Sequence, residues 1–277
     1  MSEHSLEVAG LTLGYDGADI VSELSTDIPA GAITAIIGAN ASGKSTLLRG
    51  ISRLLAPRAG QVLLDGVPVH SMRSGDLARL VGLLPQSPVA PSSITVGDLV
   101  GRGRYPHQGW FRRWTPDDDA AVDEALEATG TADLVSRRVA DLSGGQRQRV
   151  WIAMALAQDT DILLLDEPTT FLDVNYQIEV LDLLVDLNRD RGKTVVMVLH
   201  ELSLACRYAD HLIAMKNGRI VTEGTPGEVV TAAIVEEVFS LPCDVISDPR
   251  SGTPLVIPLG RHRIGSVRTA GGRVDEP

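Results

Sequence analysis

The stretch AITAIIGANASGKSTLLRGISRLL, Ala32 to Leu55, decides the fold of this chain. Its first part, residues 32–38, is a continuous apolar run, which is typical of a strand buried on both faces of a sheet. Glycine-rich residues follow, and residues 47–55 have helical spacing that stops before Pro57, because the residue before a proline is disfavoured in a helix. The order strand, loop, helix is the setting in which a glycine-rich loop binds phosphate.

Residues Gly38 to Thr46, GANASGKST, match the phosphate-binding pattern GxxxxGK[ST]. In such a loop the backbone N–H groups point at phosphate oxygens, and the N-terminus of the following helix adds positive potential. The pattern assigns Lys44 to the β- and γ-phosphates of ATP, Ser45 to Mg²⁺ and Thr46 to a further phosphate contact. We therefore predict ATP and Mg²⁺ as cofactors, with nucleotide contacts from Gly38, Asn40, Ala41, Ser42, Gly43, Lys44, Ser45 and Thr46.

A second apolar run, ILLLDEP, Ile162 to Pro168, ends in two carboxylates. Ligands gather at the carboxyl ends of strands in an open parallel sheet. Asp166 is expected to hold Mg²⁺, and Glu167 to orient and deprotonate the attacking water. Taken alone, an acidic pair after a strand is equally consistent with a helix cap or a loop. The phosphate-binding loop favours the catalytic interpretation.

The rest of the chain has an α/β pattern with no internal repeat. Further strands or hairpins are expected at residues 6–15, 20–28, 61–70, 80–86, 194–200 and 211–224. Helices are expected at residues 143–158 and 174–190, and one last helix is expected to run from Thr225 to Phe239. Residues 92–140 change to helical spacing, with a strong helix start at Thr115-Pro116-Asp117, and form a helical insertion. Strands that alternate with helices imply a mainly parallel sheet.

Composition excludes several classes of protein. The net charge of -11 over 277 residues gives no broad basic surface for nucleic acid or anionic lipid. Cys206 and Cys243 are too few for a disulfide scaffold, so reduced thiols in the cytosol are expected. The N-terminus has no signal-peptide pattern, and no apolar run is long enough for a membrane helix. A polar, Gly-rich stretch, residues 259–277, is expected to be a flexible tail.

The segment LSGGQ, Leu142 to Gln146, narrows the range of phosphate-loop enzymes. With it the chain resembles the ABC transporter ATPase family, and the resemblance covers most of an expected domain at residues 4–258. It implies the ABC ATPase type of P-loop NTPase fold: a mainly parallel core sheet, an N-terminal antiparallel β subdomain and a helical subdomain at about 92–140. In that family, Ser143, Gly144, Gly145 and Gln146 complete the active site of a second ATPase subunit. The resemblance thus implies a dimer, most simply a homodimer.

Four single residues lie where the family pattern expects functional groups. Gln86 resembles the glutamine that senses Mg²⁺ and the attacking water, and His200 resembles the switch histidine that contacts the γ-phosphate. Tyr15 resembles the aromatic residue that stacks on adenine, and Asp173 resembles the aspartate that links the two sites of the dimer. On their own, Gln86, His200 and Tyr15 are more often a capping amide, a strand-end histidine and a core tyrosine. Their order and spacing favour function.

Three residues depart from the family pattern. Ala41 stands where glycine is most common, and a positive φ there would cost roughly 1 kcal/mol. Phe171 occupies a position that is usually small, and Glu201 follows the switch histidine where aspartate is common. The cost at Ala41 is expected to be tolerated, and the departures at Phe171 and Glu201 concern the coupling between the two sites of the dimer, while the catalytic set remains complete.

The helical insertion carries the segment VGRGRYPHQGW, Val100 to Trp110. It resembles the part of siderophore, haem and cobalamin importer ATPases that faces the permease, although a solvated basic loop is the plain alternative. The resemblance implies transmembrane permease subunits as partners, only indirect contact with a substrate-binding protein, and a peripheral position at the cytoplasmic face of the inner membrane. Fe(III)–siderophore import is favoured over haem or cobalamin import.

Two other classes of function remain open. A soluble ABC-type ATPase acting on ribosomes or DNA would generally carry duplicated cassettes, coiled coils or basic faces, which the sequence lacks. A P-loop kinase would have no use for the LSGGQ segment.

Overall fold

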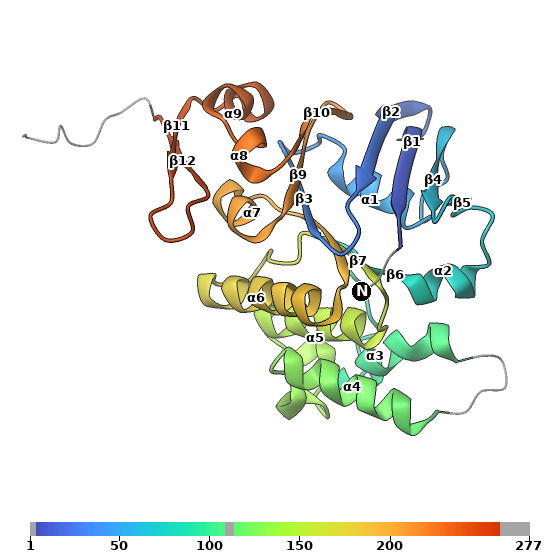
Figure 1. Cartoon of the computed structure of the whole chain (residues 1–277). Coiled ribbons are helices and arrows are strands. Elements are labelled where there is room, and N and C mark those ends of the chain that lie inside the picture. The colour runs from blue at the N-terminus through green and yellow to red at the C-terminus, as the bar shows by residue number, and fades with distance from the viewer. Residues whose placement is uncertain (1–3, 109–113, 261–277) are drawn as a thin grey trace, which may run out of the picture.

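The computed structural model describes residues 4–108 and 114–260 (Figure 1). The predicted tail, apart from residues 259 and 260, and the last two residues of the Val100–Trp110 segment lie outside the described residues. The described part is an α/β structure with two large sheets and a C-terminal hairpin. None of its helices has the length and apolar character needed to cross a membrane.

The core sheet is mainly parallel and has the strand order β10-β9-β3-β8-β7-β6. Its parallel pairs are β9 with β3, β3 with β8, β8 with β7 and β7 with β6, while β10 is antiparallel to β9. Every residue of β3, β7 and β8 is buried, as the continuous apolar runs predict. The strands are β3 Ile33–Gly38, β6 Val81–Leu84, β7 Ile162–Asp166, β8 Thr194–Val198, β9 His211–Lys216 and β10 Arg219–Gly224.

The N-terminal sheet is antiparallel and has the strand order β2-β1-β4-β5. Its apolar side shares one core with helix α1, Lys44–Ile51, and with one face of the core sheet. The sheet, blue in β1 and β2 and cyan in β4 and β5, lies at the upper right in Figure 1. Its strands are β1 Leu6–Tyr15, β2 Ala18–Ile28, β4 Ala59–Leu64 and β5 Val67–Pro68. This arrangement confirms the antiparallel β subdomain.

The helical insertion (green) lies at the bottom of Figure 1. The expected helix start at Thr115 is confirmed, because Thr115 and Asp118 form a capping box with Pro116 in the first turn. Helix α5 begins with a second capping box, formed by Ser143 and Gln146. The insertion contains α3 Val96–Gly101 and α4 Pro116–Ala128, with the 3-10 turns η1 Arg102–His107, η2 Ala132–Leu134 and η3 Val139–Asp141. Outside the insertion lie α2 Ser74–Leu80, α5 Gly144–Ala157 and α6 Val174–Arg191.

The single helix predicted from Thr225 to Phe239 is wrong. The structure has two short helices there, α8 Pro226–Val229 and α9 Ala232–Phe239. Thr225 forms a capping box with Glu228, and Thr231 accepts a bond from the Ile234 N–H, so each helix has its own start. Helix α7, Leu202–Tyr208, and the hairpin of β11, Cys243–Ser247, with β12, Pro254–Pro258, complete the described chain.

Candidate active site

The glycine-rich loop joins the end of β3 to the start of α1 in a tightly turned conformation. Gly38, Ala41 and Gly43 have φ angles of 155°, 62° and 100°. A Cβ atom at Gly38 would stand 2.3 Å from the Met215 carbonyl oxygen, so only glycine fits there. Ala41 has the positive φ that the sequence analysis considered, and it therefore carries the backbone strain of a left-handed residue.

The side chain of Lys44 lies over the loop that precedes it. Its Nζ donates hydrogen bonds to the carbonyl oxygens of Gly38, at 2.9 Å, and Ala39, at 2.8 Å. Burial lowers the pKa of the Lys44 ammonium, and the charges of Glu167 and Asp166 oppose that shift. The ammonium is thus held at the mouth of the loop, where it would meet phosphate oxygens.

Ser45 and Asp166 are joined although they are 121 residues apart in the sequence. The Ser45 hydroxyl donates to Asp166 Oδ1 at 2.8 Å. Burial raises the pKa of the Asp166 carboxyl, the hydrogen bond from Ser45 opposes the shift, and the nearby Glu167 charge adds to it. A side-chain oxygen from the start of α1 and one from the end of β7 therefore lie side by side.

Glu167 stands next to Asp166 and contacts His200 and Gln86. The His200 Nε2 is 2.6 Å from Glu167 Oε1, and the Thr170 hydroxyl donates to Glu167 Oε2 at 3.1 Å. Burial raises the pKa of the Glu167 carboxyl, but hydrogen bonds from His200, Gln86 and Thr170 and the charge of His200 outweigh it, so the pKa is lowered. The structure therefore brings together Glu167 and Gln86, which are predicted to act on the attacking water, and His200, which is predicted to contact the γ-phosphate.

Most of these groups, but not Gly38 or Asp166, line one open cleft of about 650 Å³, a volume in the usual range for ligand sites. The cleft is lined by residues 40–46 together with Ile20, Gln86, Glu167, Thr170 and His200. The residues present fit a nucleoside triphosphate, because the turned loop and the Lys44 ammonium both line this open cleft. They also fit Mg²⁺, which needs only one or two protein oxygens and keeps several waters. No group of three or more His, Cys, Asp or Glu gathers into another metal site among the described residues.

The LSGGQ segment is not part of this cleft. Ser143 and Gly144 are exposed at the N-terminus of α5, where the Ser143 hydroxyl accepts from the Gln146 N–H at 3.2 Å and Gln146 Oε1 accepts from the Ser143 N–H at 3.1 Å. Asp173 is likewise exposed and caps α6 by accepting from the Tyr176 N–H. Phe171 is 77% exposed with a φ of 68°, which is unusual for a bulky residue.

Tyr15 is not among the residues that line the cleft. It is 39% exposed at the end of β1, and its hydroxyl accepts a hydrogen bond from Arg49 Nη1 at 3.2 Å. Two lining residues were missed by the sequence analysis. Thr170 has a signal in the sequence, since a hydroxyl three residues after Glu167 can reach back to it. Ile20 has none, because it is an apolar residue in a strand like its neighbours.

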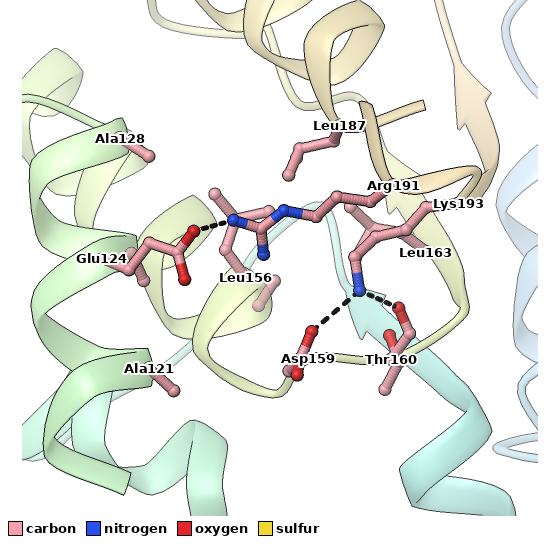
Figure 2. Close-up of a pocket in the computed structure, with 12 residues that line it drawn as sticks. Ala121, Glu124, Ala128, Leu156, Asp159, Thr160, Leu163, Leu187, Arg191 and Lys193 are labelled. Atoms are coloured by element: carbon pink, nitrogen blue, oxygen red, sulfur yellow. Dashed lines mark hydrogen bonds and ion pairs between the residues drawn. The ribbon is translucent and has the colours of Figure 1, made fainter. Parts of the chain in front are cut away.

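A second, smaller cavity of about 60 Å³ lies away from this chemistry, between α4 and the C-terminal ends of α5 and α6 (Figure 2). Figure 2 shows the guanidinium of Arg191 paired with Glu124 across it. Lys193 Nζ contacts Asp159 Oδ1 at 2.9 Å and the Thr160 carbonyl oxygen at 2.7 Å. Its volume suits a few water molecules and is far too small for a nucleotide.

Comparison with known proteins places the chain in a family. The ABC transporter family matches residues 21–170. The chain is 53% identical to the probable siderophore transport system ATP-binding protein YusV of Bacillus subtilis, over 95% of this chain and 96% of that protein. It is 54% identical to the ferric enterobactin transport ATP-binding protein FepC of Escherichia coli, over 91% and 93%.

A solved structure with the same fold is the dimeric bacterial ABC transporter cassette MJ0796. It matches with a TM-score of 0.72 and 27% identity, over 79% of this chain and 98% of that chain. The chain therefore belongs to the ABC transporter family, and it is similar to ATP-binding proteins of siderophore transport systems.

Proposed function

We propose that this chain is the ATP-hydrolysing subunit of an ABC importer that takes up Fe(III)–siderophore complexes through separate transmembrane subunits. The observation that carries the hydrolytic part is the contact of Glu167 with His200 and Gln86 beside the phosphate-binding loop. The substrate class is supported by the identity above 50% with YusV and FepC over more than nine-tenths of the chain.

The residues of the cleft take separate roles in this proposal. The loop N–H groups and Lys44 bind the phosphates of ATP, with Thr46 as a further contact. Ser45 and Asp166 hold Mg²⁺, which when bound neutralises developing charge on the phosphates. Gln86 would orient the water and contact the metal. Tyr15, which does not line the cleft, is proposed to stack on the adenine.

Glu167 is proposed to orient the attacking water and to take its proton. Its lowered pKa keeps it ionised, which suits the orientation of water but makes it a weak base in the free chain. His200 supplies much of that lowering. If His200 turns toward the γ-phosphate, the carboxylate loses this hydrogen bond and its pKa moves up toward the operating pH. His200 would then both contact the nucleotide and activate Glu167.

Hydrolysis is proposed to require a second copy of the chain. Ser143, Gly144 and Gly145 lie outside the cleft of their own chain, and Ser143 and Gly144 are exposed, so they are available to the cleft of a partner. Their position at the N-terminus of α5 gives free N–H groups and positive potential for phosphate oxygens. Phe171 lies near them, since a Cβ atom at Gly144 would be 3.9 Å from that of Phe171.

The permease is proposed to contact the helical subdomain, so that the chain lies at the cytoplasmic face of the inner membrane. An open groove of about 650 Å³ there is lined by α3, η1 and neighbouring loops. Two aromatic side chains on it are exposed, Tyr105 at 60% and Trp114 at 45%. Exposed aromatic residues around a concavity are typical of protein-binding surfaces.

The first test is uptake of labelled Fe(III)–siderophore, haem and cobalamin in cells that lack this chain. Complementation with the wild-type chain is expected to restore iron–siderophore uptake, while Glu167→Gln is expected not to. If haem or cobalamin uptake is restored instead, the substrate class is wrong. If no uptake changes while the purified chain hydrolyses ATP, a soluble ATPase role replaces the importer. Phosphate transfer to a small acceptor would favour a kinase.

The second test concerns pairing. Glu167→Gln with ATP and Mg²⁺ is expected to elute as a dimer in size-exclusion chromatography, because it binds ATP but hydrolyses it slowly. Ser143→Arg in the same background places a bulky cation at the partner's γ-phosphate region and is expected to return the chain to a monomer. A monomeric Glu167→Gln chain with ATP bound would contradict the role given to Ser143.

A further inference from the structure

The C-terminal end of α5 is capped by residues from another part of the chain. The last four carbonyl groups of a helix have no partner within it, and a positive charge there is favourable. The last turn of α5 contains no basic residue. At its other end, α5 begins at Ser143. One end of α5 therefore meets these capping residues, and the other end carries Ser143.

The cap comes from the 3-10 turn η1, Arg102–His107. Arg104 Nη1 donates to the Ala157 carbonyl oxygen at 2.8 Å, and His107 Nε2 donates to the Gln158 carbonyl oxygen at 2.7 Å. The two backbones also touch, since a Cβ atom at Gly103 would stand 2.3 Å from the Met154 carbonyl oxygen. The turn is thus fixed on the last turn of α5 by two side-chain hydrogen bonds and one close backbone approach.

Arg104 also binds the start of α4. Its Nε donates to Asp118 Oδ1 at 3.0 Å, and both residues are buried, at 7% and 1% exposure. Asp118 is the carboxylate of the α4 capping box with Thr115. Burial raises the pKa of Asp118, but hydrogen bonds from Arg104 and Thr115 outweigh it, so the pKa is lowered and the pair is ionised. One forked guanidinium therefore holds two helix ends.

One of the two residues between Arg104 and His107 points outward. Tyr105 is 60% exposed on the groove proposed to contact the permease. On the core side, Arg79 Nε of α2 donates a hydrogen bond to the Pro106 carbonyl oxygen of the turn at 2.8 Å. The turn is therefore bound to α4 and α5 by buried contacts and to α2 by an exposed one.

We propose that Arg104 is a positioning residue for transport, which joins the Tyr105 turn, α4 and α5 into one rigid unit. A displacement of Tyr105 by the permease then turns α5 and moves Ser143. Ser143 lies at the opposite end of this 14-residue helix, about 21 Å from the end that the turn caps. The inference rests on the proposed function, and it adds the contacts through which a displacement at the permease surface reaches the nucleotide. Buried, geometrically defined contacts carry such a displacement, because packed elements shift as units.

The test compares Arg104→Lys with Arg189→Lys, the same substitution at an exposed site on α6. Lysine keeps the charge for Asp118 but has no fork to reach the Ala157 carbonyl as well. His107→Ala is the second variant, because it removes the other cap of α5 without touching the buried ion pair. Each is assembled with the transmembrane subunits, and transport is divided by ATP hydrolysed.

Arg104→Lys is expected to lower transport per ATP about tenfold while ATP hydrolysis by the isolated chain stays within about twofold of wild type. His107→Ala is expected to lower it less, and Arg189→Lys to leave it unchanged. Hydrolysis and transport that fall in equal proportion would show a merely structural role and overturn the inference. Arg104→Lys with both transport and hydrolysis at the wild-type level would also overturn the inference.

A second readout needs no permease or substrate. In the Glu167→Gln background, ATP and Mg²⁺ are expected to slow amide hydrogen exchange in residues 102–108 and 144–157 together. With Arg104→Lys added, the change in residues 144–157 is expected to remain and that in residues 102–108 to disappear. An unchanged response in both segments would overturn the inference. If neither segment responds when Arg104 is present, the proposed ATP-driven pairing fails, and the inference falls with it.

Discussion

Ala41→Gly is expected to stabilise the nucleotide-free chain. Ala41 has a φ of 62°, and the left-handed conformation costs a residue with a Cβ atom roughly 1–2 kcal/mol. Glycine removes that strain, but its chain loses more entropy on folding, by roughly 0.5–1 kcal/mol. Because Ala41 is exposed, its methyl group adds little by burial. The expected net effect is a stabilisation of about 0.5–1 kcal/mol.

Ala39→Gly is the matched control, in the same loop. Ala39 is not among the residues with positive φ, so glycine there relieves no strain and is expected to destabilise the chain by about 0.5–1 kcal/mol. The unfolded-state entropy is common to both changes, so their difference isolates the strain at Ala41, about 1–2 kcal/mol. Loss of the half-buried Ala39 methyl group widens the difference slightly.

Thermal or urea unfolding measures this difference, without nucleotide, because a ligand of the native state would shift the midpoint by mass action. For a chain of this size, about 1 kcal/mol moves the melting temperature by about 2–4 °C. Ala41→Gly is therefore expected to melt above wild type and Ala39→Gly below it. If Ala41→Gly destabilises the chain as much as Ala39→Gly does, the strain at Ala41 does not exist in solution.

Three further predictions concern other parts of the chain. Burial and the Asp182 charge raise the pKa of Tyr208 to about 12, above its usual 10.0. The free energy of unfolding is therefore expected to fall as pH rises from about 10 to about 12, and Tyr208→Phe should flatten that part of a pH–stability curve. Ser45→Ala removes the donor to Asp166 and is expected to weaken ATP affinity roughly tenfold in Mg²⁺ but not in EDTA, as measured by calorimetry. Arg191→Gln should change the free energy of unfolding by less than about 0.5 kcal/mol, because both partners of its ion pair are about half exposed; a loss above about 1 kcal/mol in urea unfolding would contradict this.

The sequence allowed prediction of the elements whose signals are local. Residues 32–55 carry a complete strand, loop and helix, and Thr115 and Ser143 begin helices through capping boxes that depend on residues three positions away. The hairpin of β11 and β12 was not foreseen, because its two strands are short, although Asp248, Pro249 and Gly252 between them are typical turn residues.

Contacts between distant residues were predicted only through the family resemblance. Ser45 with Asp166, and Glu167 with His200, meet because β3, β7 and β8 are parallel neighbours whose carboxyl ends share one edge. No local pattern gives the strand order, so no local pattern gives these distances. The buried pair of Arg104 and Asp118 is a similar case, since a segment whose plain alternative was a solvated basic loop proved to hold a buried guanidinium.

The two hydrogen bonds from Lys44 to the carbonyl oxygens of Gly38 and Ala39 have a consequence for timing. They keep the phosphate-binding loop folded before any nucleotide arrives, so the loop need not be ordered during the encounter. We therefore expect ATP to enter at a rate governed by diffusion and local charge, with little dependence on loop rearrangement. We then expect the slower association and dissociation of two chains to limit the rate of each cycle.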